Sequence, residues 1–588
     1  MFRNRVIHME SAQMTIYNSI QMNFDKSSHR RTDLFRCFSF LVLAVAFCAA
    51  TANAQLTNAH TLYGDIPGDA AGTSVSGIGD INGDFCSDVV VGMPGGDLGV
   101  VDSGTVRVYS GLDGSILFTF DGDLTLDSLG SSVSGAGDVN NDGVNDVIAG
   151  APGVDTNGID SGMARVYSGT TGVVLYTVNG LVAGDSFGSS VSGAGDVNND
   201  GFADFIVGSP NSDPNGNQSG SATVFSGIDG SVLYTFIGDS ADDQCGSSVS
   251  DAGDVNDDGS ADVIVGIPGA NANQFIDSGR VRVFSGADGS TLLERGGDAT
   301  NDRLGSSVAG AGDIDEDDFD DFMAGSPAAD SVRVYSGVDG STIHNLTGTS
   351  NSSFGASVSN AGDVNADGIN DVIVGASGDN TNGAAAGAAT VFSGLTGLVL
   401  QTVFGDTAGD LFGSSVSGAG DINADAFADV IVGALGDFPP DLIPNPMGPA
   451  PMMGSSRIFT APFVPVLVYN SLLADSRLRL RWTPDLGDPN ALSGTISCSN
   501  ATPGAFGRFG LSLAPANSVI FGFPLLLAID PVNLIDSGNF GYGFSGAVSV
   551  TAVSRQNAFL AGSFVFIQFF ESAPIPASSN GIAMLVVL

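Results

Sequence analysis

Short apolar runs broken by glycine, aspartate and proline recur along most of the chain. In one copy, residues 129–137 lead into an acidic loop, the apolar run 147–149 follows it at once, and two further runs, 164–169 and 173–178, come after a polar loop. Runs of small, β-branched and aromatic residues bounded by glycine, proline and aspartate are typical of β-strands. The pattern therefore predicts four short strands in this copy.

The same unit returns at a nearly fixed spacing. The aspartate that opens the acidic loop stands at positions 80, 138, 196, 254, 313, 363 and 421, so successive copies lie 58, 58, 58, 59, 50 and 58 residues apart. A period of this order indicates an array of one supersecondary unit. Four antiparallel strands repeated radially make the blades of a propeller. The expected fold class is all-β, with a seven-bladed β-propeller over residues 55–462.

The two ends of the array predict how the ring closes. Residues 56–64 align with a fourth strand that has no preceding unit, whereas the seventh unit stops after residues 456–460 without a fourth strand of its own. Pairing these two segments leaves no open sheet edge. We therefore expect the N-terminal strand to complete the last blade.

Residues 463–588 have a different composition and lack the repeat. Apolar runs separated by glycine, proline and asparagine predict a separate β-rich domain resembling a small β-sandwich. Arg477, Arg479 and Arg481 alternate, so they share one strand face. This stripe is either a dock for an acidic surface or an anionic glycan, or a solvated face.

The first 54 residues form a different kind of sequence. Arg30, Arg31 and Arg36 precede the apolar run 38–47, and Ala52-Asn53-Ala54 follows it. A basic segment, a short apolar core and a small-residue cleavage site make a secretory signal, with cleavage expected after Ala54. The apolar core is too short to span a membrane. We expect the mature protein to be secreted or at the cell surface, with no membrane span.

The charge balance excludes some partners. The chain has 64 acidic and 19 basic residues, and removal of the leader leaves 61 and 13, a net charge of −48 without a single lysine. Nucleic acids and anionic lipids are bound through cationic contacts, so neither is an expected partner. Cys86, Cys245 and Cys498 are too few and too widely spaced for a disulfide framework, and we interpret them as inert small residues.

The acidic loop has the spacing of a cation site. In Asp138-Val139-Asn140-Asn141-Asp142-Gly143-Val144-Asn145-Asp146, positions 1, 3, 5 and 9 offer carboxylate or amide oxygens, and position 6 is glycine. Hard oxygen ligands around a tight turn favour Ca²⁺, with a backbone carbonyl added from position 7. A solvated acidic turn is the alternative for any single copy, but seven copies in the same setting favour metal. The predicted ligands are Asp80, Asn82, Asp84, Asp88, Asp138, Asn140, Asp142, Asp146, Asp196, Asn198, Asp200, Asp204, Asp254, Asn256, Asp258, Asp262, Asp313, Asp315, Asp317, Asp321, Asp363, Asn365, Asp367, Asp371, Asp421, Asn423, Asp425 and Asp429.

Position 6 ranks the seven loops. It is glycine in units two, three, four and six, whereas Phe85, Asp318 and Ala426 stand there in the others. A left-handed backbone at this position costs a non-glycine residue about 1 kcal/mol, and least for aspartate. We expect up to seven Ca²⁺ sites, strongest in units two, three, four and six and weaker at Phe85 and Ala426.

The flanks of the loops carry a family resemblance. Phe187-Gly188 through Gly208-Ser209-Pro210, Phe354-Gly355 through Gly375-Ala376, and Leu129-Gly130 through Gly150-Ala151-Pro152 resemble the FG-GAP repeats of the integrin α-chain propeller. The resemblance covers about 400 residues. It implies a calcium-dependent extracellular module for adhesion or for binding proteins or glycans. The partner subunit, leg domains and membrane span of integrins have no counterpart here, so integrin signalling is not implied.

Polar loops of variable length separate the second and third strands. They include residues 153–160, 211–219, 269–278 and the proline-rich 435–455. Strand alternation places them on the face opposite the acidic loops. Variable loops on a fixed scaffold commonly form binding surfaces. The alternative is that they vary because nothing depends on them.

We expect no enzyme activity. After removal of the leader only His60 and His344 remain, far apart in sequence, and no nucleophile elbow, phosphate loop or zinc-protease motif is present. The alternative is a calcium-dependent polysaccharide lyase or another carbohydrate-active enzyme on a propeller scaffold. Tyr167 and Arg282 are the candidate bases for that reaction.

Overall fold

The computed structural model describes residues 56–97, 100–439 and 453–461 with their side chains. Beyond these it describes the backbone of five strands: β29 (Arg479–Pro484), β30 (Ser493–Ser499), β31 (Val548–Val553), β32 (Phe564–Ile567) and β33 (Met584–Val587). The expected leader, residues 1–54, lies outside the described residues.

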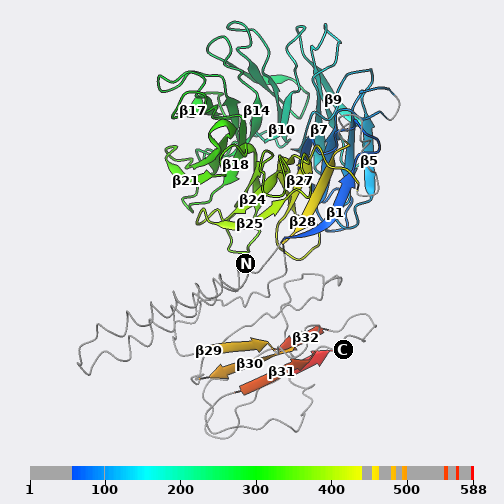
Figure 1. Ribbon diagram of the computed structural model, residues 1–588, viewed down its shortest axis with the longest axis vertical. Helices are drawn as coiled ribbons and strands as arrows, with labels where there is room; N and C mark the ends of the chain where they lie inside the picture. The colour runs from blue at the N-terminus through cyan, green and yellow to red at the C-terminus, as the bar shows by residue number, and fades with distance from the viewer. Residues whose placement is uncertain are drawn as a thin grey trace, which may run out of the picture. The chain divides into compact units, whose positions relative to one another are not determined.

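Seven antiparallel sheets of four strands each form a propeller (Figure 1). Units one to three consist of β2 (Ser74–Gly79), β3 (Asp88–Met93), β4 (Thr105–Tyr109) and β5 (Ile116–Asp121); β6 (Ser132–Gly137), β7 (Asp146–Ala151), β8 (Met163–Tyr167) and β9 (Val174–Asn179); and β10 (Ser190–Gly195), β11 (Asp204–Ser209), β12 (Ser221–Phe225) and β13 (Val232–Ile237). Units four and five consist of β14 (Ser248–Gly253), β15 (Asp262–Ile267), β16 (Arg280–Phe284) and β17 (Thr291–Gly296); and β18 (Ser307–Gly312), β19 (Asp321–Ser326), β20 (Ser331–Tyr335) and β21 (Thr342–Thr347). Units six and seven consist of β22 (Phe354–Gly362), β23 (Asp371–Ala376), β24 (Ala388–Phe392) and β25 (Val399–Phe404); and β26 (Phe412–Gly420), β27 (Asp429–Ala434), β28 (Ser455–Thr460) and β1 (Thr57–Tyr63). The prediction of an all-β, seven-bladed propeller is confirmed.

The ring closes as the sequence predicts. Strand β1 pairs antiparallel with β28, so that Thr57 lies opposite Thr460 and Thr61 opposite Arg457. In Figure 1 the yellow β28 lies beside the blue β1, and the strand colours run around the ring between them. The sheet of unit seven therefore takes one strand from the start of the array and three from its end.

The burial of each strand follows from its place in the blade. The second strands, such as β7, are buried at every residue, because sheets of neighbouring units cover both of their faces. The fourth strands, such as β9, form the outer edge and keep exposed residues. Apolar and β-branched side chains therefore concentrate in the second and third strands, where packing between units stabilises the ring.

Glycines of the repeat motif allow neighbouring units to approach closely. A Cβ atom at Gly150 would collide with the carbonyl oxygen of Gly188 in the next unit, and one at Gly208 would collide with that of Gly246. Gly188 itself has a φ of +90° and donates its N–H to the carbonyl of Gly208 at 3.0 Å. The glycine in the second strand of one unit therefore packs against the glycine that precedes the first strand of the next unit.

Serines of the innermost strands join every pair of neighbouring units. At six junctions a valine N–H donates to a serine Oγ of the preceding unit at 2.9–3.1 Å, and at the junction of units five and six Ser307 Oγ donates to the Gly355 carbonyl at 2.8 Å. The acceptors are Ser74, Ser132, Ser190, Ser248, Ser357 and Ser415. The inner wall of the propeller is therefore closed by one serine contact at each junction.

The strands after the propeller form two antiparallel sheets. The order of the first is β29-β30-β31, and β32 pairs with β33. The packing of one sheet on the other, which a sandwich requires, lies outside the described residues. Arg479 and Arg481 lie two residues apart in β29, as expected for one strand face, and Arg477 lies outside the described residues.

Helix is almost absent from the described residues. Their one helical element is the 3₁₀ turn η1 (Pro327–Ala329), which replaces the loop between the second and third strands of unit five. None of the described helices has the length and apolar character needed to cross a membrane.

Candidate metal loops and the opposite face

The acidic loops join the first strand of each unit to the second, and the turns between the third and fourth strands lie beside them. In unit two the Gly169 N–H of that turn donates to Asp146 Oδ1 at 2.9 Å, and in unit one the Gly111 N–H donates to Asp88 Oδ1 at 3.1 Å. We call the side formed by the loops 80–88, 138–146, 196–204, 254–262, 313–321, 363–371 and 421–429, together with these turns, the loop face. The loops between the second and third strands, together with the segments that link one unit to the next, form the connector face.

Backbone hydrogen bonds fold each acidic loop around its first aspartate. In unit two, Asp138 Oδ1 accepts the Asp142 N–H at 2.9 Å, and its Oδ2 accepts the Gly143 N–H at 2.8 Å. Asp142 Oδ1 in turn accepts the Val144 N–H at 3.1 Å. Positions 1 and 5 are therefore held on the inside of one turn, with their remaining lone pairs free for a cation.

Unit five shows how closely the oxygens approach. Here positions 1, 3 and 5 are all carboxylates, and one oxygen each of Asp313, Asp315 and Asp317 lies within 4.8 Å of the others. Elsewhere position 3 is asparagine, which supplies a neutral amide oxygen in the same place. In unit five the structure thus brings positions 1, 3 and 5 together, whereas Asp321, at position 9, is not part of this group. Metal binding by these residues stays a prediction.

Two of the position-3 amides have an unsatisfied acceptor. Asn140 Oδ1 and Asn423 Oδ1 are buried and have no hydrogen-bond partner. A buried acceptor left unpaired costs about 1–3 kcal/mol. Carboxylate and amide oxygens are the donors that Ca²⁺ prefers, so the residues present fit a calcium ion, which would satisfy these oxygens.

The aspartate at position 9 is buried and tied to two segments. Asp146 Oδ2 accepts the Val139 N–H of its own loop at 2.9 Å, while Oδ1 accepts the Gly169 N–H of the neighbouring turn. Burial raises the pKa of Asp146 to about 6, and the two N–H groups partly offset this rise. Sequence reasoning identified position 9 only as a ligand and missed this second role of clamping the turn. Its ligation of metal stays a prediction.

The backbone at position 6 is left-handed in all seven loops. Its φ is +87° to +92° at the four glycines, +70° at Phe85, +72° at Asp318 and +70° at Ala426. The predicted left-handed backbone at position 6 is confirmed for the non-glycine residues as well. The Phe85 side chain also projects into solvent, with 78% of its surface exposed.

Neighbouring acidic loops are linked by their backbones. At five junctions the N–H of position 8 donates to the carbonyl of position 1 in the preceding unit, as Ala203 does to Asp138 at 3.1 Å. The other donors are Ser87, Ala261, Asp320 and Ala428. These bonds could not be predicted from the side chains, because they join backbone groups. The only related feature of the sequence is that four of the five donor residues at position 8 are small.

Arginines on the third strands bridge neighbouring units across the connector face. Five pairs join such an arginine to an aspartate at the start of the preceding connector: Arg107–Asp65, Arg165–Asp123, Arg282–Asp239, Arg333–Asp298 and Arg457–Asp406. In units three and six, Thr223 and Thr390 replace the arginine, and Leu181 and Thr349 replace its partner. Both partners change together, so the pair is kept or lost as a whole. The sequence analysis did not predict these bridges. The joint replacement of the arginine and the aspartate at the same two junctions is the sequence feature that could have revealed them.

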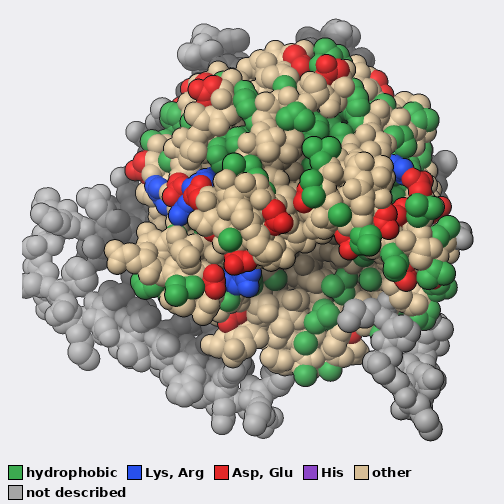
Figure 2. Space-filling view, turned by 90° about the horizontal axis from the view of Figure 1, so that it is seen from above, with side chains coloured by type: hydrophobic (Ala, Val, Ile, Leu, Met, Phe, Trp, Pro, Cys, Tyr) green, Lys and Arg blue, Asp and Glu red, His purple; other side chains and the backbone are tan. Residues whose placement is uncertain are grey.

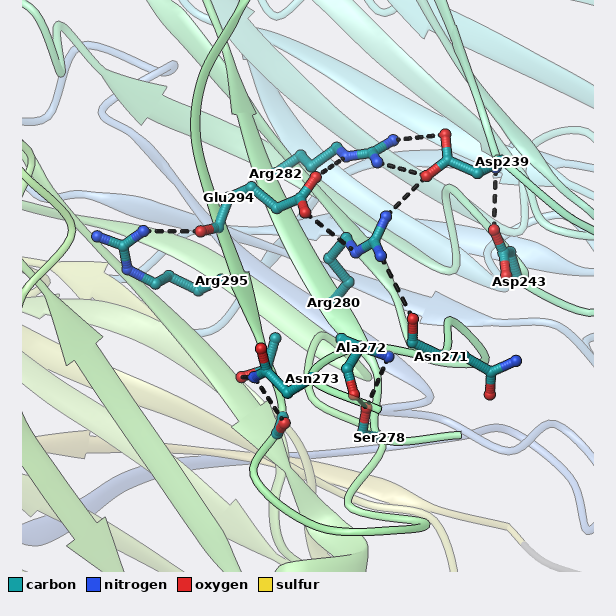
Figure 3. A network of polar contacts seen from close by, with 12 residues as sticks. Asp239, Asp243, Asn271, Ala272, Asn273, Ser278, Arg280, Arg282, Glu294 and Arg295 are labelled. Atoms are coloured by element: carbon teal, nitrogen blue, oxygen red, sulfur yellow. Dashed lines mark hydrogen bonds and ion pairs between the residues drawn. The ribbon is translucent and has the colours of Figure 1, made fainter. Parts of the chain in front are cut away.

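The bridge between units three and four is the most extensive (Figure 3). Arg280 and Arg282 point toward Asp239 from one side, and Glu294 lies against both arginines, with Arg280 Nη1 at 2.7 Å from Asp239 Oδ2 and Arg282 Nε at 2.6 Å from Glu294 Oε2. The Arg282 guanidinium holds the pKa of Asp239 below its usual value. Figure 2 likewise shows basic side chains lying against acidic ones.

Both candidate bases of the lyase alternative are engaged in the fold. Arg282 belongs to the ion-pair network, and the Tyr167 ring is buried and stacks on Phe120 with the centroids 3.9 Å apart. Burial raises the pKa of Tyr167, so the phenol stays protonated at neutral pH and no tyrosinate is present to act as the base. No observation in the described residues favours catalysis at either residue.

The histidines and cysteines have structural surroundings. His60 Nε2 lies 3.1 Å from the Gly111 carbonyl, and His344 Nε2 lies 2.6 Å from the Gly394 carbonyl, each joining a fourth strand to the next unit. Cys86 and Cys245 are buried free thiols. Burial raises their pKa values to about 11 and about 12, so neither is a thiolate at neutral pH. Cys498 lies in β30, whose side chains are outside the described residues.

The comparisons with known proteins agree with this geometry. The profile of the FG-GAP repeat matches residues 71–109, 129–171, 187–225 and 354–392, which fall in units one, two, three and six. The chain carries FG-GAP repeats. Units four, five and seven have the same four-stranded build as these FG-GAP units.

The FG-GAP propeller is similar to integrin α chains. The similarity is 36% identity over 149 residues to integrin alpha-5 of Xenopus laevis, 30% over 158 residues to integrin alpha-8 of Mus musculus and 30% over 159 residues to integrin alpha-6 of Homo sapiens. The matches cover 24%, 24% and 26% of this chain, but only 14%, 14% and 13% of those proteins. The likeness is therefore to a part of the integrin α chain, and it makes the propeller integrin-α-like.

Proposed function

We propose that this chain is a secreted, calcium-binding FG-GAP propeller that serves as an extracellular interaction module rather than an enzyme. The observation that carries the proposal is the contrast between a uniform loop face and a variable connector face. The loop face repeats one oxygen-rich turn in every unit, whereas the connector face differs from unit to unit. A uniform scaffold that presents variable loops is typical of recognition proteins.

The proposed role of calcium is structural. Positions 1, 3, 5 and 9 and the carbonyl of position 7 would hold the ion, with units two, three, four and six as the strongest sites. Bound calcium would supply positive charge to acidic loops in a chain with a mature net charge of −48. The residues themselves set the turn, because position 1 gathers the backbone N–H groups and position 9 ties the turn to its neighbour.

The proposed organisation has three parts. Residues 1–54 would be a secretory leader, residues 55–462 the propeller and residues 463–588 a β-rich C-terminal domain. The leader-like sequence and the likeness to integrin α chains support an extracellular or cell-surface location. The ligand class supported by both is an extracellular protein or glycan.

Binding to panels of extracellular proteins and glycans, with calcium and with chelator, tests the function. We expect calcium-dependent binding to at least one panel member, and weaker binding when a short turn replaces residues 435–455. The fold should survive this replacement, because changes of surface loop length affect stability little. Turnover of any glycan, or binding unaffected by every change on the connector face, would contradict the proposal.

A further inference from the structure

Three neighbouring connectors differ from the other four. Each link between units begins with a glycine directly after the fourth strand, such as Gly64 after β1. The second residue after this glycine is Ile66, Leu124 or Val182 in the links from unit seven to one, one to two and two to three. The same position is Ser240, Ala299, Ser350 and Thr407 in the remaining links. Six of the seven links have the same length, and the link from unit five to unit six is one residue shorter. Links of the common length carry either a large apolar residue or a small residue here, so the length of the link does not demand the large apolar one.

The loops between these connectors carry apolar tips as well. We call the first loop residue whose carbonyl accepts an N–H from the following connector the tip residue. It is Val101 in unit one and Ile159 in unit two, whereas it is Asn217 in unit three and Ala384 in unit six. Unit four has an apolar tip of its own at Ile276, but its connector is polar. The tip of the unit seven loop lies outside the described residues. Among the loops whose tips the structure describes, apolar tips and apolar connectors coincide over units one and two.

Backbone hydrogen bonds place these connectors and loops side by side. The Gly95 N–H donates to the Asp69 carbonyl at 3.2 Å, the Leu126 N–H to the Val101 carbonyl at 3.4 Å, and the Gly153 N–H to the Asp127 carbonyl at 3.2 Å. The Gly184 N–H then donates to the Ile159 carbonyl at 2.8 Å. We call the surface of Ile66, Val101, Leu124, Leu126, Ile159, Leu181 and Val182 the apolar sector.

The side chains of the apolar sector face solvent. Their exposed fractions run from 44% at Ile66 to 82% at Leu181. Leu181 stands where five other connectors have the aspartate of an ion pair, so an apolar side chain faces solvent there instead of a carboxylate. Exposed aliphatic groups that gather on neighbouring segments are unfavourable in water and mark interaction surfaces.

The surroundings of the sector define its partner. Exposed aspartates lie on the same loops, including Asp97, Asp155 and Asp160, while Arg107 and Arg165 are already paired with Asp65 and Asp123. A complementary surface therefore combines apolar side chains with lysine or arginine. A second copy of this chain would bring a like charge of −48 and be repelled. The sector lacks the aromatic rings on which sugars stack, so a protein fits it better than a glycan.

We propose that the apolar sector docks a protein partner whose contact surface places lysine or arginine around an apolar centre. The inference rests on the proposed function and refines it, because it names one sector of the connector face and one class of partner.

The test uses the full mature protein and two synthetic peptides, of which the first is amphipathic and the second is polar throughout. One combines leucine with lysine, and the other replaces each leucine with serine. The sector variant is Leu124→Ser, Leu181→Ser, Val182→Ser, and the matched control is Leu395→Ser, Leu398→Ser, Val399→Ser, which changes residues exposed by 50%, 68% and 57% in unit six. All six side chains are exposed, so melting temperatures should stay near that of the unmodified protein.

We expect the leucine–lysine peptide to bind the unmodified protein and the control alike, to bind the sector variant at least about tenfold more weakly, and to lose affinity with added salt. The serine–lysine peptide should not distinguish the three proteins. Equal binding of the leucine–lysine peptide to all three, or a loss confined to the control, would overturn the inference. If calcium-dependent binding in the extracellular panels persists in the sector variant, the sector assignment fails while the proposed function stands.

Discussion

On the loop face, the segment between the first and second strands has eight residues in every unit, and its first aspartate accepts the same backbone N–H groups each time. On the connector face, the segment between the second and third strands shrinks to a single 3₁₀ turn in unit five and extends over residues 435–454 in unit seven. The exposed side chains of that face range from leucine to aspartate. The hydrogen bonds inside each acidic loop fix its length and its key residues, whereas the segments of the connector face need only to link strands and can vary in length and sequence.

The largest expected effect is the loss of thermal stability when calcium is removed from the loop face. Ions that bind only the folded state stabilise it by about 2.7 kcal/mol per site at a concentration one hundred times Kd, and up to seven sites are proposed. Addition of a calcium chelator should therefore lower Tm substantially in a thermal melt. Readdition of calcium should restore Tm, and magnesium serves as the control ion. An unchanged melt would remove the structural role of calcium.

Much of the loop face could be predicted from sequence, because its information is local. The spacing of Asp138, Asn140, Asp142 and Gly143 fixes one turn, and the period of the array gives the blades. The contacts between units could not be predicted this way. The pairing of Arg282 with Asp239, and the clamp from Asp146 to Gly169, depend on how segments far apart in sequence meet in space. The apolar sector likewise emerged only when exposure was known.

The second effect tests the most buried bridge of the connector face. The side chains of Arg457 and Asp437 are only 8% and 7% exposed, and their charged atoms lie 2.7 Å apart. Arg457→Ala leaves a buried carboxylate unpaired, which costs about 3–5 kcal/mol. The loss should appear as a lower Tm both with and without calcium. Addition of Asp437→Asn should recover part of it, and a loss seen only without calcium would contradict the assignment.

The third effect sharpens the ranking of the acidic loops. A Cβ atom at Gly201 would meet open space, so Gly201→Ala changes only the cost of the left-handed backbone. We expect about 1 kcal/mol, or about fivefold weaker calcium binding at that loop. Ala426→Gly should strengthen binding by a similar factor. Titration calorimetry of the two variants checks this, and equal affinities would refute the ranking.

The smallest effect concerns an exposed bridge. Arg165 and Asp123 form an ion pair in which the side chains are 16% and 60% exposed. Exposed pairs contribute about 0–1 kcal/mol, so Arg165→Ala with Asp123→Ala should change Tm far less than Arg457→Ala does. A loss equal to that of Arg457→Ala would show that burial does not govern these bridges.

Crystals grown in calcium give the most direct test of the central claim, which is that the acidic loops hold calcium. Anomalous difference density should appear in the loops of units two, three, four and six, at about 2.3–2.6 Å from the oxygens of positions 1, 3 and 5. Weaker peaks are expected where Phe85 and Ala426 occupy position 6. Acidic loops without anomalous density at millimolar calcium would contradict the account.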